Sequence, residues 1–374
     1  MGAHECHHPI TQETYQHQPI ARQEQAQGNC PQSIRNKVVM QNQQVHTPIR
    51  EAKPLISFII PYYNLPVQML QECIESILRL SLHPSEREII VVDDGSDNSP
   101  VKDLSNCEDC IIYVRQNNAG PGMARNRGMQ MATGQYLQFV DADDYLVSVS
   151  YEYCLNIMRN QQPDIVMFDF RNNVPDNQID TSNFKTSKLQ SGIEYMSQYN
   201  LRATVWGYLF KRSILGSLRF DADIYNHEDE EFTPQLLLRA ETLCSTNVKA
   251  YYYRQRPHSL TSGNNRRQII KRLNEHLLVI KKLSSLANIL PTKERLALAR
   301  RISQLTMDYI YAIIMQTRNR HYLNRKLLIL RKSGLFPLPD RKYTTKYKWF
   351  RRLTNSNTGL SLLINLLPLL RKER

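Results

Sequence analysis

The stretch Gly134-Gln-Tyr-Leu-Gln-Phe-Val-Asp-Ala-Asp-Asp-Tyr-Leu146 decides both the fold and the chemistry expected of this chain. Its apolar first half is typical of a buried strand, and three carboxylates follow it, Asp141, Asp143 and Asp144. Carboxylates this close repel one another, and a divalent cation relieves that repulsion. Oxygen ligands favour a hard ion, so we expect Mn²⁺ or Mg²⁺, held by one or two carboxylates together with substrate phosphates. The alternative for such a cluster is a solvated acidic turn.

Three further strand patterns precede this stretch. They cover residues 55–61, 88–92 and 111–114, and helical patterns over 65–80 and 123–131 alternate with them. This alternation predicts an α/β fold with a mostly parallel open sheet and helices on both faces. Ligands of such sheets gather at the carboxyl ends of the strands, where the acidic and glycine-containing segments of this chain lie.

Six motifs occur in a fixed order between about residue 55 and residue 260. They are Ser57-x-x-x-Pro61-x-Tyr63-Asn64, Val91-Val92-Asp93-Asp94-Gly95-Ser96, Asn118-x-Gly120 with Ala124-Arg125-Asn126-x-Gly128, Phe139-Val140-Asp141-Ala142-Asp143-Asp144, Trp206-x-x-Leu209-Phe210-Lys211-Arg212 and Glu228-Asp229-Glu230-x-Phe232. In these motifs the chain resembles the family 2 glycosyltransferases, which are inverting enzymes of the GT-A fold that use nucleotide-sugar donors. The resemblance implies a Rossmann-like GT-A sheet. It does not extend to residues 1–50.

The resemblance implies a nucleotide-sugar pocket at the carboxyl edge of the sheet. The residues that it assigns to this pocket are Pro61, Tyr63, Asn64, Asp93, Asp94, Asn118, Gly120, Arg125 and Asp141. Asp93 or Asp94 would accept a hydrogen bond from the base. Arg125, near the positive end of a helix dipole, would lie close to the diphosphate, with a surface salt bridge as its alternative.

The resemblance also divides the work of the three aspartates. Asp141 would hold the ribose or a metal-bound water, Asp143 would ligate the metal that bridges the diphosphate, and Asp144 would assist from beside it. The choice between Mn²⁺ and Mg²⁺ stays open. Arg254, Arg256 and His258, in and after a last predicted strand, are further candidate contacts for phosphate.

The reaction of such an enzyme needs a carboxylate that takes the proton of the attacking hydroxyl, a role worth roughly 10² to 10⁴ in rate. The run 226–231 opens an amphipathic segment, so its acids are predicted at the amino end of a helix. By the resemblance, Asp229 aligns with the usual catalytic carboxylate, and Glu228 is the second candidate. The alternative is that these acids only complement the helix dipole. Trp206 and His227 are candidate acceptor-site residues, although Trp206 is equally compatible with the core.

Length and composition bound the domain organisation. The 374 residues, 41% of them hydrophobic, suffice for one large core and a smaller unit. Seven cysteines without a secretory leader predict reduced thiols and a cytoplasmic location. We expect a flexible low-complexity leader over 1–50, a catalytic domain over 51–262, a helical extension over 263–336 and a basic membrane-interface tail over 337–374.

The positive charge is concentrated at one end of the chain. Residues 265–374 contain 25 Lys and Arg against 5 acids, a net charge of +20, so the remainder carries −7. The apolar helix predicted over 359–370 is shorter than the ~20 residues that span a bilayer. Its basic and aromatic neighbours favour peripheral binding to the inner face of the cell membrane. The alternative is a helical cap packed on the catalytic domain.

These patterns together predict an inverting, metal-assisted glycosyltransferase. It would move a sugar from a nucleotide-diphosphate donor, with UDP favoured by family habit, to a hydroxyl of a glycan acceptor that the tail suggests is lipid-linked. The expected setting is synthesis of a surface polysaccharide such as capsule or lipopolysaccharide. Its expected partners include the membrane surface and exclude nucleic acid. Two alternatives stay open, namely a module that binds nucleic acid or anionic membranes through the basic tail, and a sugar nucleotidyltransferase.

Overall fold

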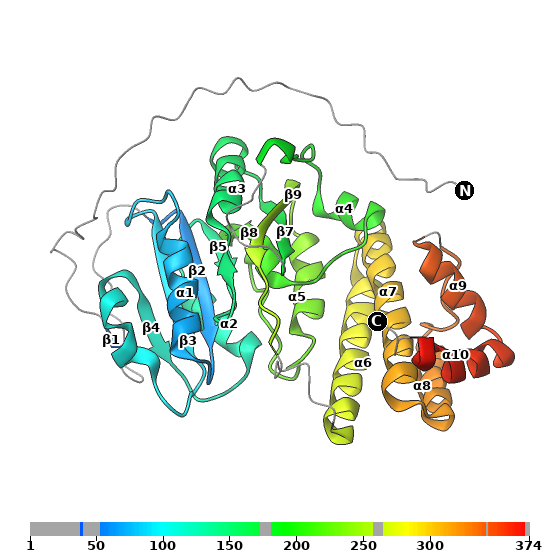
Figure 1. Cartoon of the computed structure of the whole chain (residues 1–374). Coiled ribbons are helices and arrows are strands. Elements are labelled where there is room, and N and C mark those ends of the chain that lie inside the picture. Colours follow the sequence, from blue (N-terminus) through cyan, green and yellow to red (C-terminus); the bar gives the residue numbers. More distant parts are fainter. Residues whose placement is uncertain (1–37, 40–52, 173–180, 257–264, 342, 371–374) are drawn as a thin grey trace.

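The computed structural model describes residues 38–39, 53–172, 181–256, 265–341 and 343–370. One sheet lies at the centre of the amino-terminal part, and a set of helices follows it (Figure 1). The predicted leader and the candidate phosphate contact His258 lie outside the described residues, apart from Val38–Val39, which form strand β1. The four segment boundaries stay predictions.

The described strands form one nine-stranded sheet in the order β1-β4-β3-β2-β5-β8-β7-β9-β6. All neighbours from β1 to β5 pair in parallel, as do β7 and β9, whereas β8 runs antiparallel to β5 and β7, and β6 to β9. The mostly parallel open α/β sheet is therefore confirmed. The strand bounds are β1 Val38–Val39, β2 Ile56–Tyr62, β3 Arg87–Asp93, β4 Ile112–Arg115, β5 Tyr136–Phe139, β6 Tyr145–Leu146, β7 Ile165–Arg171, β8 Tyr208–Lys211 and β9 Leu243–Tyr252.

Ten α-helices are described, and the helical patterns over 65–80, 123–131 and 359–370 predicted α1, α2 and α10 to within a few residues. Their bounds are α1 Val67–Leu78, α2 Pro121–Met131, α3 Ser148–Gln161, α4 Gly192–Gln198, α5 Glu228–Leu237, α6 Arg266–Ile289, α7 Thr292–Thr317, α8 Arg320–Lys332, α9 Thr345–Thr354 and α10 Asn357–Leu370. Short 3₁₀ segments cover Pro100–Cys110, Thr181–Asn183, Val205–Gly207 and Arg212–Leu215.

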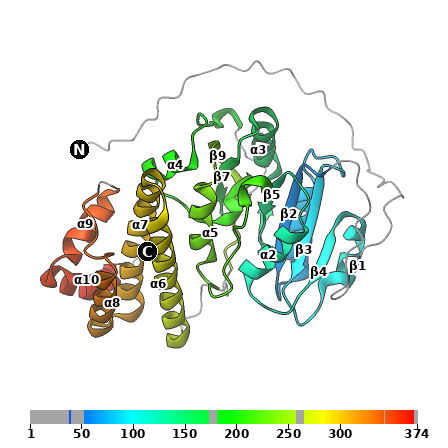
Figure 2. The same cartoon turned by 180° about the vertical axis from the view of Figure 1, so that it is seen from behind.

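Helices cover both faces of the sheet because the central strands are apolar on both sides (Figures 1 and 2). Phe58 of β2 faces α3, where its ring lies 6.2 Å from that of Tyr151. The next residue, Ile59, faces α2 at Gly128, where an added Cβ would lie 2.3 Å from the isoleucine methyl. Successive strand residues point to opposite faces, so one strand builds two cores. Each such buried side chain contributes roughly 1.5–3 kcal/mol.

The carboxyl-terminal helices share a core with the sheet. Helix α7 packs on α6 and on α4, and α6 also contacts α5, so the apolar cluster on the α2 side of the sheet continues into the helices. Helices α9 and α10 pack on α7 at the end remote from the sheet (Figure 2). Within the described part of the chain, no helix combines the length and apolar character needed to cross a bilayer.

Candidate functional site

Two loops are tied together where β2 and β3 end. The backbone amide of Asn64 donates to Ser96 Oγ at 3.0 Å, and the side chain of Asn64 exchanges hydrogen bonds of 3.1 and 2.8 Å with Asp97. Asn64 has φ +45°, a left-handed conformation that asparagine tolerates better than most residues. Beside it the ring of Tyr63 is exposed and Pro61 is half-buried, so all three predicted pocket residues lie at the carboxyl edge.

The loop after β4 is fixed by Asp94. Its Oδ1 accepts from the amide of Ala119 at 2.9 Å, and its Oδ2 accepts from the amide of Gly120 at 2.7 Å. Gly120 has φ +93°, and an added Cβ would lie 2.6 Å from the ring of Tyr225, so glycine is required there. Asn118 of the same loop is exposed. Asp94 Oδ1 also accepts from Gln116 Nε2 at 2.7 Å. A contact between Asp94 and a base stays a prediction.

Asp93, the other candidate for the contact with the base, lies within the protein, so Asp94 is the better placed of the two. It is fully buried, and its oxygens accept from the Ser96 amide at 2.8 Å, the Tyr113 hydroxyl at 2.6 Å and Arg115 Nη1 at 3.0 Å. Burial, together with the hydrogen bond to Asp93, raises the pKa of Tyr113 to about 12. Asp93 therefore organises the end of β3 from within.

Asp144 is also withdrawn from the edge. Its oxygens accept from the Tyr251 hydroxyl and from the Arg254 amide, both at 2.8 Å, and its side chain is buried. Burial, and then the charges of Asp141 and Asp143, raise the pKa of Asp144 to about 8. The role of Asp144 beside the metal stays a prediction, and in the structure each of its oxygens bonds to the protein.

Asp141 and Asp143 remain accessible, with side chains 27% and 20% exposed. Asp141 Oδ1 accepts from Arg125 Nη2 at 2.8 Å, and Asp143 Oδ2 forms an ion pair with Arg256. Burial, followed by the charge of Asp141, raises the pKa of Asp143. The described residues contain no group of three or more His, Cys, Asp or Glu that could hold a metal. A site of two carboxylates completed by substrate phosphates is compatible with this donor set.

Arg125 joins the two acidic clusters. Its side chain is only 4% exposed, and its Nη1 lies 2.9 Å from Glu228 Oε1 and 3.5 Å from Asp229 Oδ1, while its Nη2 bonds to Asp141. Burial lowers the pKa of Arg125, but the three carboxylates outweigh it and raise the pKa above its ordinary value. The contact of Arg125 with a diphosphate stays a prediction, and in the structure this guanidinium is shared by three carboxylates.

Glu228 and Asp229 begin α5, as the sequence predicted. Burial and the charge of Glu228 raise the pKa of Asp229 well above its ordinary value. Asp229 Oδ1 is buried without a hydrogen-bond partner, whereas Oδ2 accepts a weak bond of 3.4 Å from the Val205 amide. Its side chain is still 24% exposed. This is the environment expected of a proton acceptor, and Glu228, bonded directly to Arg125, has less freedom to act as one.

The rings of Trp206 and His227, the two candidate acceptor-site residues, pack against other rings of the protein. Trp206 is buried, stacked on Tyr251 at 4.3 Å with Phe170 edge-on at 5.2 Å, so the core alternative holds. The ring of His227 lies 4.5 Å from that of His276 of α6, and burial lowers the pKa of His227. His227, at the start of α5, therefore takes part in the packing of α5 on α6.

Sequence reasoning missed Tyr251 as a site residue. Besides bonding Asp144, its hydroxyl accepts from the Asp141 amide at 3.1 Å, so it fixes the backbone of the aspartate cluster. The tyrosines at 251–253 indicate a strand, in which successive side chains point to opposite faces. This alternation was the available sign that Tyr251 and Tyr252 have different surroundings. Arg254 and Arg256, predicted to contact phosphate, lie at the aspartate cluster: the Arg254 Nε donates to the Asp143 carbonyl at 2.9 Å, and Arg256 forms an ion pair with the Asp143 side chain.

Comparison with known proteins agrees with this geometry. The sequence profile of glycosyl transferase family 2 matches residues 57–215. An uncharacterized glycosyltransferase, EpsJ of Bacillus subtilis, is 33% identical over 221 residues, which cover 56% of this chain and 63% of EpsJ. The poly(ribitol-phosphate) beta-glucosyltransferase of Bacillus spizizenii is 28% identical over 235 residues, covering 60% of this chain and 33% of that protein. The chain thus spans less than two thirds of the length of both relatives.

A solved structure shares the fold. The crystal structure of Staphylococcus aureus TarS residues 1–349 superposes with a TM-score of 0.53 at 17% identity, over 80% of this chain and 91% of that one. A further crystal structure of the same TarS fragment contains UDP-GlcNAc. This likeness supports the GT-A arrangement of the sheet followed by helices.

Proposed function

Because this chain belongs to glycosyl transferase family 2, we propose that it transfers a sugar from a nucleoside diphosphate donor to a hydroxyl of a glycan, with inversion at the anomeric carbon. The observation that carries the proposal is Asp229, a partly exposed carboxylate with a raised pKa and one oxygen without a hydrogen-bond partner. Asp229 and Asp141 contact the same guanidinium, that of Arg125. The proposed base would therefore lie next to the proposed donor site.

The donor would lie along the carboxyl ends of β2, β3 and β5. Tyr63 offers an exposed ring for the base, and Asn64 and Asp94 hold the two loops on either side of it. UDP is the nucleotide that we propose first, since TarS of the same fold has been crystallised with UDP-GlcNAc. The sugar itself is not assigned.

Asp141 and Asp143 would hold the metal together with the diphosphate, and Mn²⁺ or Mg²⁺ bound there would act as a Lewis acid on the leaving group. Arg256 forms its ion pair with Asp143 in the structure described here. When the diphosphate binds, this guanidinium would exchange the carboxylate for phosphate oxygens, which gives the predicted phosphate contact a route.

Asp229 would take the proton from the attacking hydroxyl. In-line attack places the acceptor on the side opposite the diphosphate. The raised pKa of Asp229 makes it a stronger base toward the hydroxyl that loses its proton in the transition state. Arg125 would keep Asp229 ionised and oriented through the 3.5 Å contact with Oδ1. Glu228 would share the charge of Arg125 and so set how strongly that residue acts on Asp229.

The acceptor that we propose is a glycan or glycopolymer, lipid-linked and presented at the membrane surface. The relative from Bacillus spizizenii, named as a poly(ribitol-phosphate) glucosyltransferase, supports a cell-surface polymer as the acceptor class. The predicted capsule and lipopolysaccharide settings are special cases of this class.

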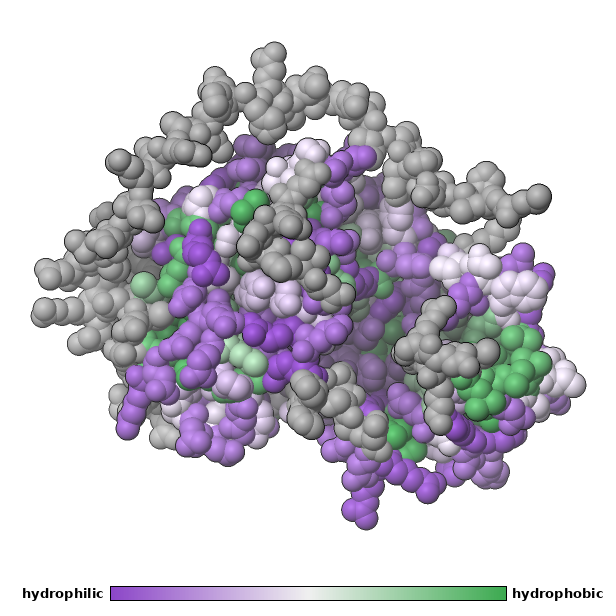
Figure 3. Space-filling model, in the orientation of Figure 1, coloured by the Kyte–Doolittle hydropathy of each residue, from purple (hydrophilic) through white to green (hydrophobic). Residues whose placement is uncertain are grey.

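The membrane contact would lie on α9 and α10. The side chains of Trp349, Leu362, Leu366 and Leu369 are 47% to 58% exposed. A hydrophobic (green) patch lies over this end of the molecule at the right of Figure 3. The three leucines recur at the spacing of one helix face. The inner face packs on α7, so the helical-cap alternative describes that side. Arg352 lies 5.5 Å from the Trp349 ring, in keeping with a basic and aromatic interface.

A thermal-shift panel tests the donor assignment. UDP-, GDP- and dTDP-sugars are added with and without Mn²⁺, and we expect a UDP-sugar at 100 times its Kd to stabilise the chain by about 2.7 kcal/mol only when the metal is present. Stabilisation by nucleoside triphosphates in place of the sugars would instead favour the nucleotidyltransferase. Stabilisation by duplex DNA or RNA alone would favour the nucleic-acid module.

A further inference from the structure

We infer that α6 and α7 position the proposed catalytic base, with Arg301 as the residue that clamps the two segments meeting at Asp229. The inference rests on the proposed function, since it assigns a role toward the same carboxylate. It concerns the helical extension, which lies outside the family match over residues 57–215.

The turn before α5 is held from α6. Glu275 is buried, and its Oε2 accepts from both the backbone amide of Asn226 at 3.0 Å and the side-chain amide at 2.7 Å. Next to it the rings of His276 and His227 are in contact at 4.5 Å. Two consecutive residues of α6 thus fix the two residues that lead into Glu228 and Asp229.

Arg301 of α7 holds the other side. Its buried guanidinium forms an ion pair with Glu230, the residue after Asp229, and its Nη1 donates to the carbonyl of Leu201 at 2.9 Å. The segment that starts at Leu201 reaches Val205, whose amide donates to Asp229 Oδ2. One side chain therefore ties together both segments that contact Asp229.

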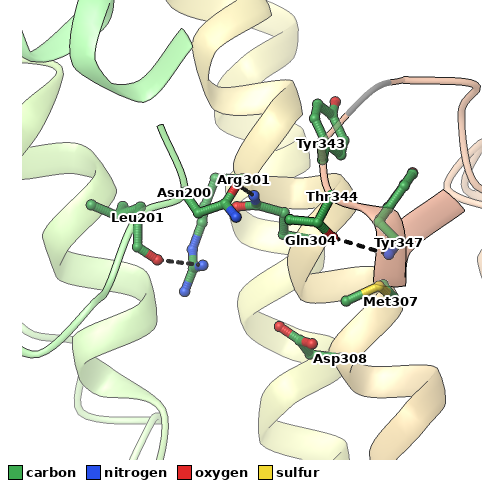
Figure 4. A pocket seen from close by; sticks show the side chains of 9 residues that line it. All are labelled: Asn200, Leu201, Arg301, Gln304, Met307, Asp308, Tyr343, Thr344 and Tyr347. Atoms are coloured by element: carbon green, nitrogen blue, oxygen red, sulfur yellow. Dashed lines mark hydrogen bonds between the residues drawn. The ribbon is translucent and has the colours of Figure 1, made fainter. Parts of the chain in front are cut away.

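A cavity of about 190 Å³ lies beside Arg301, between the Asn200–Leu201 segment, α7 and the start of α9 (Figure 4). Gln304 and Asn200 both line this cavity, and the Gln304 side-chain amide donates to Asn200 Oδ1. Glu230 keeps a side-chain exposure of 30%, so removal of Arg301 leaves a hydrated carboxylate instead of a buried unpaired charge. For this reason we expect substitutions of Arg301 to fold.

The test compares Arg301→Met, Arg301→Lys and the matched control Arg300→Met. Arg300 lies next to Arg301 on α7 but donates to Ser197 and Asn200 instead of to α5. The rate of UDP release from the UDP-sugar that the thermal-shift panel identifies is divided by the number of UDP sites counted by calorimetry, so that any loss of folded protein cancels.

We expect Arg301→Met to lower kcat per UDP site at least tenfold with the Kd for UDP within twofold of the unaltered chain. Arg301→Lys should recover most of that rate because it keeps the charge, and Arg300→Met should stay within twofold. A rate per site unchanged in Arg301→Met, or lowered equally in Arg300→Met, would overturn the inference. No UDP release by the unaltered chain would instead reject the proposed function itself, and this inference with it.

Discussion

The acidic edge of the sheet and the basic helical end carry charge in opposite ways. At the edge, one buried guanidinium serves three carboxylates, and each partner is defined by a contact of 2.8 to 3.5 Å. The end formed by residues 265–374 has a net charge of +20 spread over many side chains. Each buried, paired charge at the edge has its own defined role, whereas the basic side chains of the end attract anions through their combined charge. Single substitutions should therefore be severe at the edge and mild at the exposed charges of the end, whereas Arg301, which is buried and paired with Glu230, belongs with the charges of the edge.

The largest effect is expected at Asp229. Asp229→Asn keeps the size of the side chain but removes the proton acceptor, so transfer should fall by roughly 10² to 10⁴ while UDP binding is retained. Initial rates with the donor identified by the thermal-shift panel measure this. The control is Asp223→Asn, an exposed aspartate of the same segment, which should leave the rate unchanged. Full activity of Asp229→Asn would remove the proton acceptor from the account.

The next effect is expected at the metal site. Chelation with EDTA and the substitution Asp143→Asn should each lower transfer at least about 100-fold, since the Lewis acid supplies several kcal/mol. Mn²⁺ should restore the chelated enzyme and should fail to restore the variant. Asp103→Asn, an exposed site elsewhere on the same domain, serves as the control. Transfer that persists in EDTA would show that the edge works without a divalent ion.

A smaller effect is expected on α10. Replacing Leu362 and Leu366 with serine removes two half-exposed apolar side chains, which should weaken binding to anionic vesicles by about 2 kcal/mol. Sedimentation with vesicles measures the change, and the transfer rate on a soluble acceptor should not move. Leu296→Ser, an equally exposed leucine of α7, is the matched control. Equal sedimentation of the double variant and the control would place the membrane contact elsewhere.

The smallest effect is expected at the seam between the two regions. Burial lowers the pKa of His276 to about 3 from an ordinary 6.5, so the unfolded chain takes up the proton first as the pH falls. The free energy of unfolding should therefore decrease by about 1 kcal/mol between pH 7 and pH 5.5 on account of this residue. His276→Phe should flatten that slope in denaturant titrations, whereas His83→Gln, an exposed histidine, should keep it. An equal pH dependence of the free energy of unfolding in both variants would mean that His276 is not buried in its neutral form.

The sequence predicted most of the fold because strand and helix periodicity are local. The strand before Asp141 and the helix that begins at Glu228 follow from runs of fewer than fifteen residues. The carboxyl edge followed from these, since ligand-binding loops of a parallel sheet share one side.

The errors at the site have a common cause. Arg125 bonds Glu228 across 103 positions of sequence, and Asp144 bonds Tyr251 across 107, so neither partner is visible in the local pattern. Whether a polar residue of an edge motif is exposed or buried depends on which distant strand reaches it. For this reason the sequence did not show that Asp93 and Asp144 are buried, and Tyr251 was missed.

The measurement that tests the central claim most directly is anomalous diffraction from crystals grown with Mn²⁺ and UDP. The account predicts a manganese peak in coordination contact with Asp143 and a diphosphate oxygen, with Asp141 beside it and Asp144 still bonded to Tyr251. Manganese and diphosphate found away from these two aspartates would contradict the account.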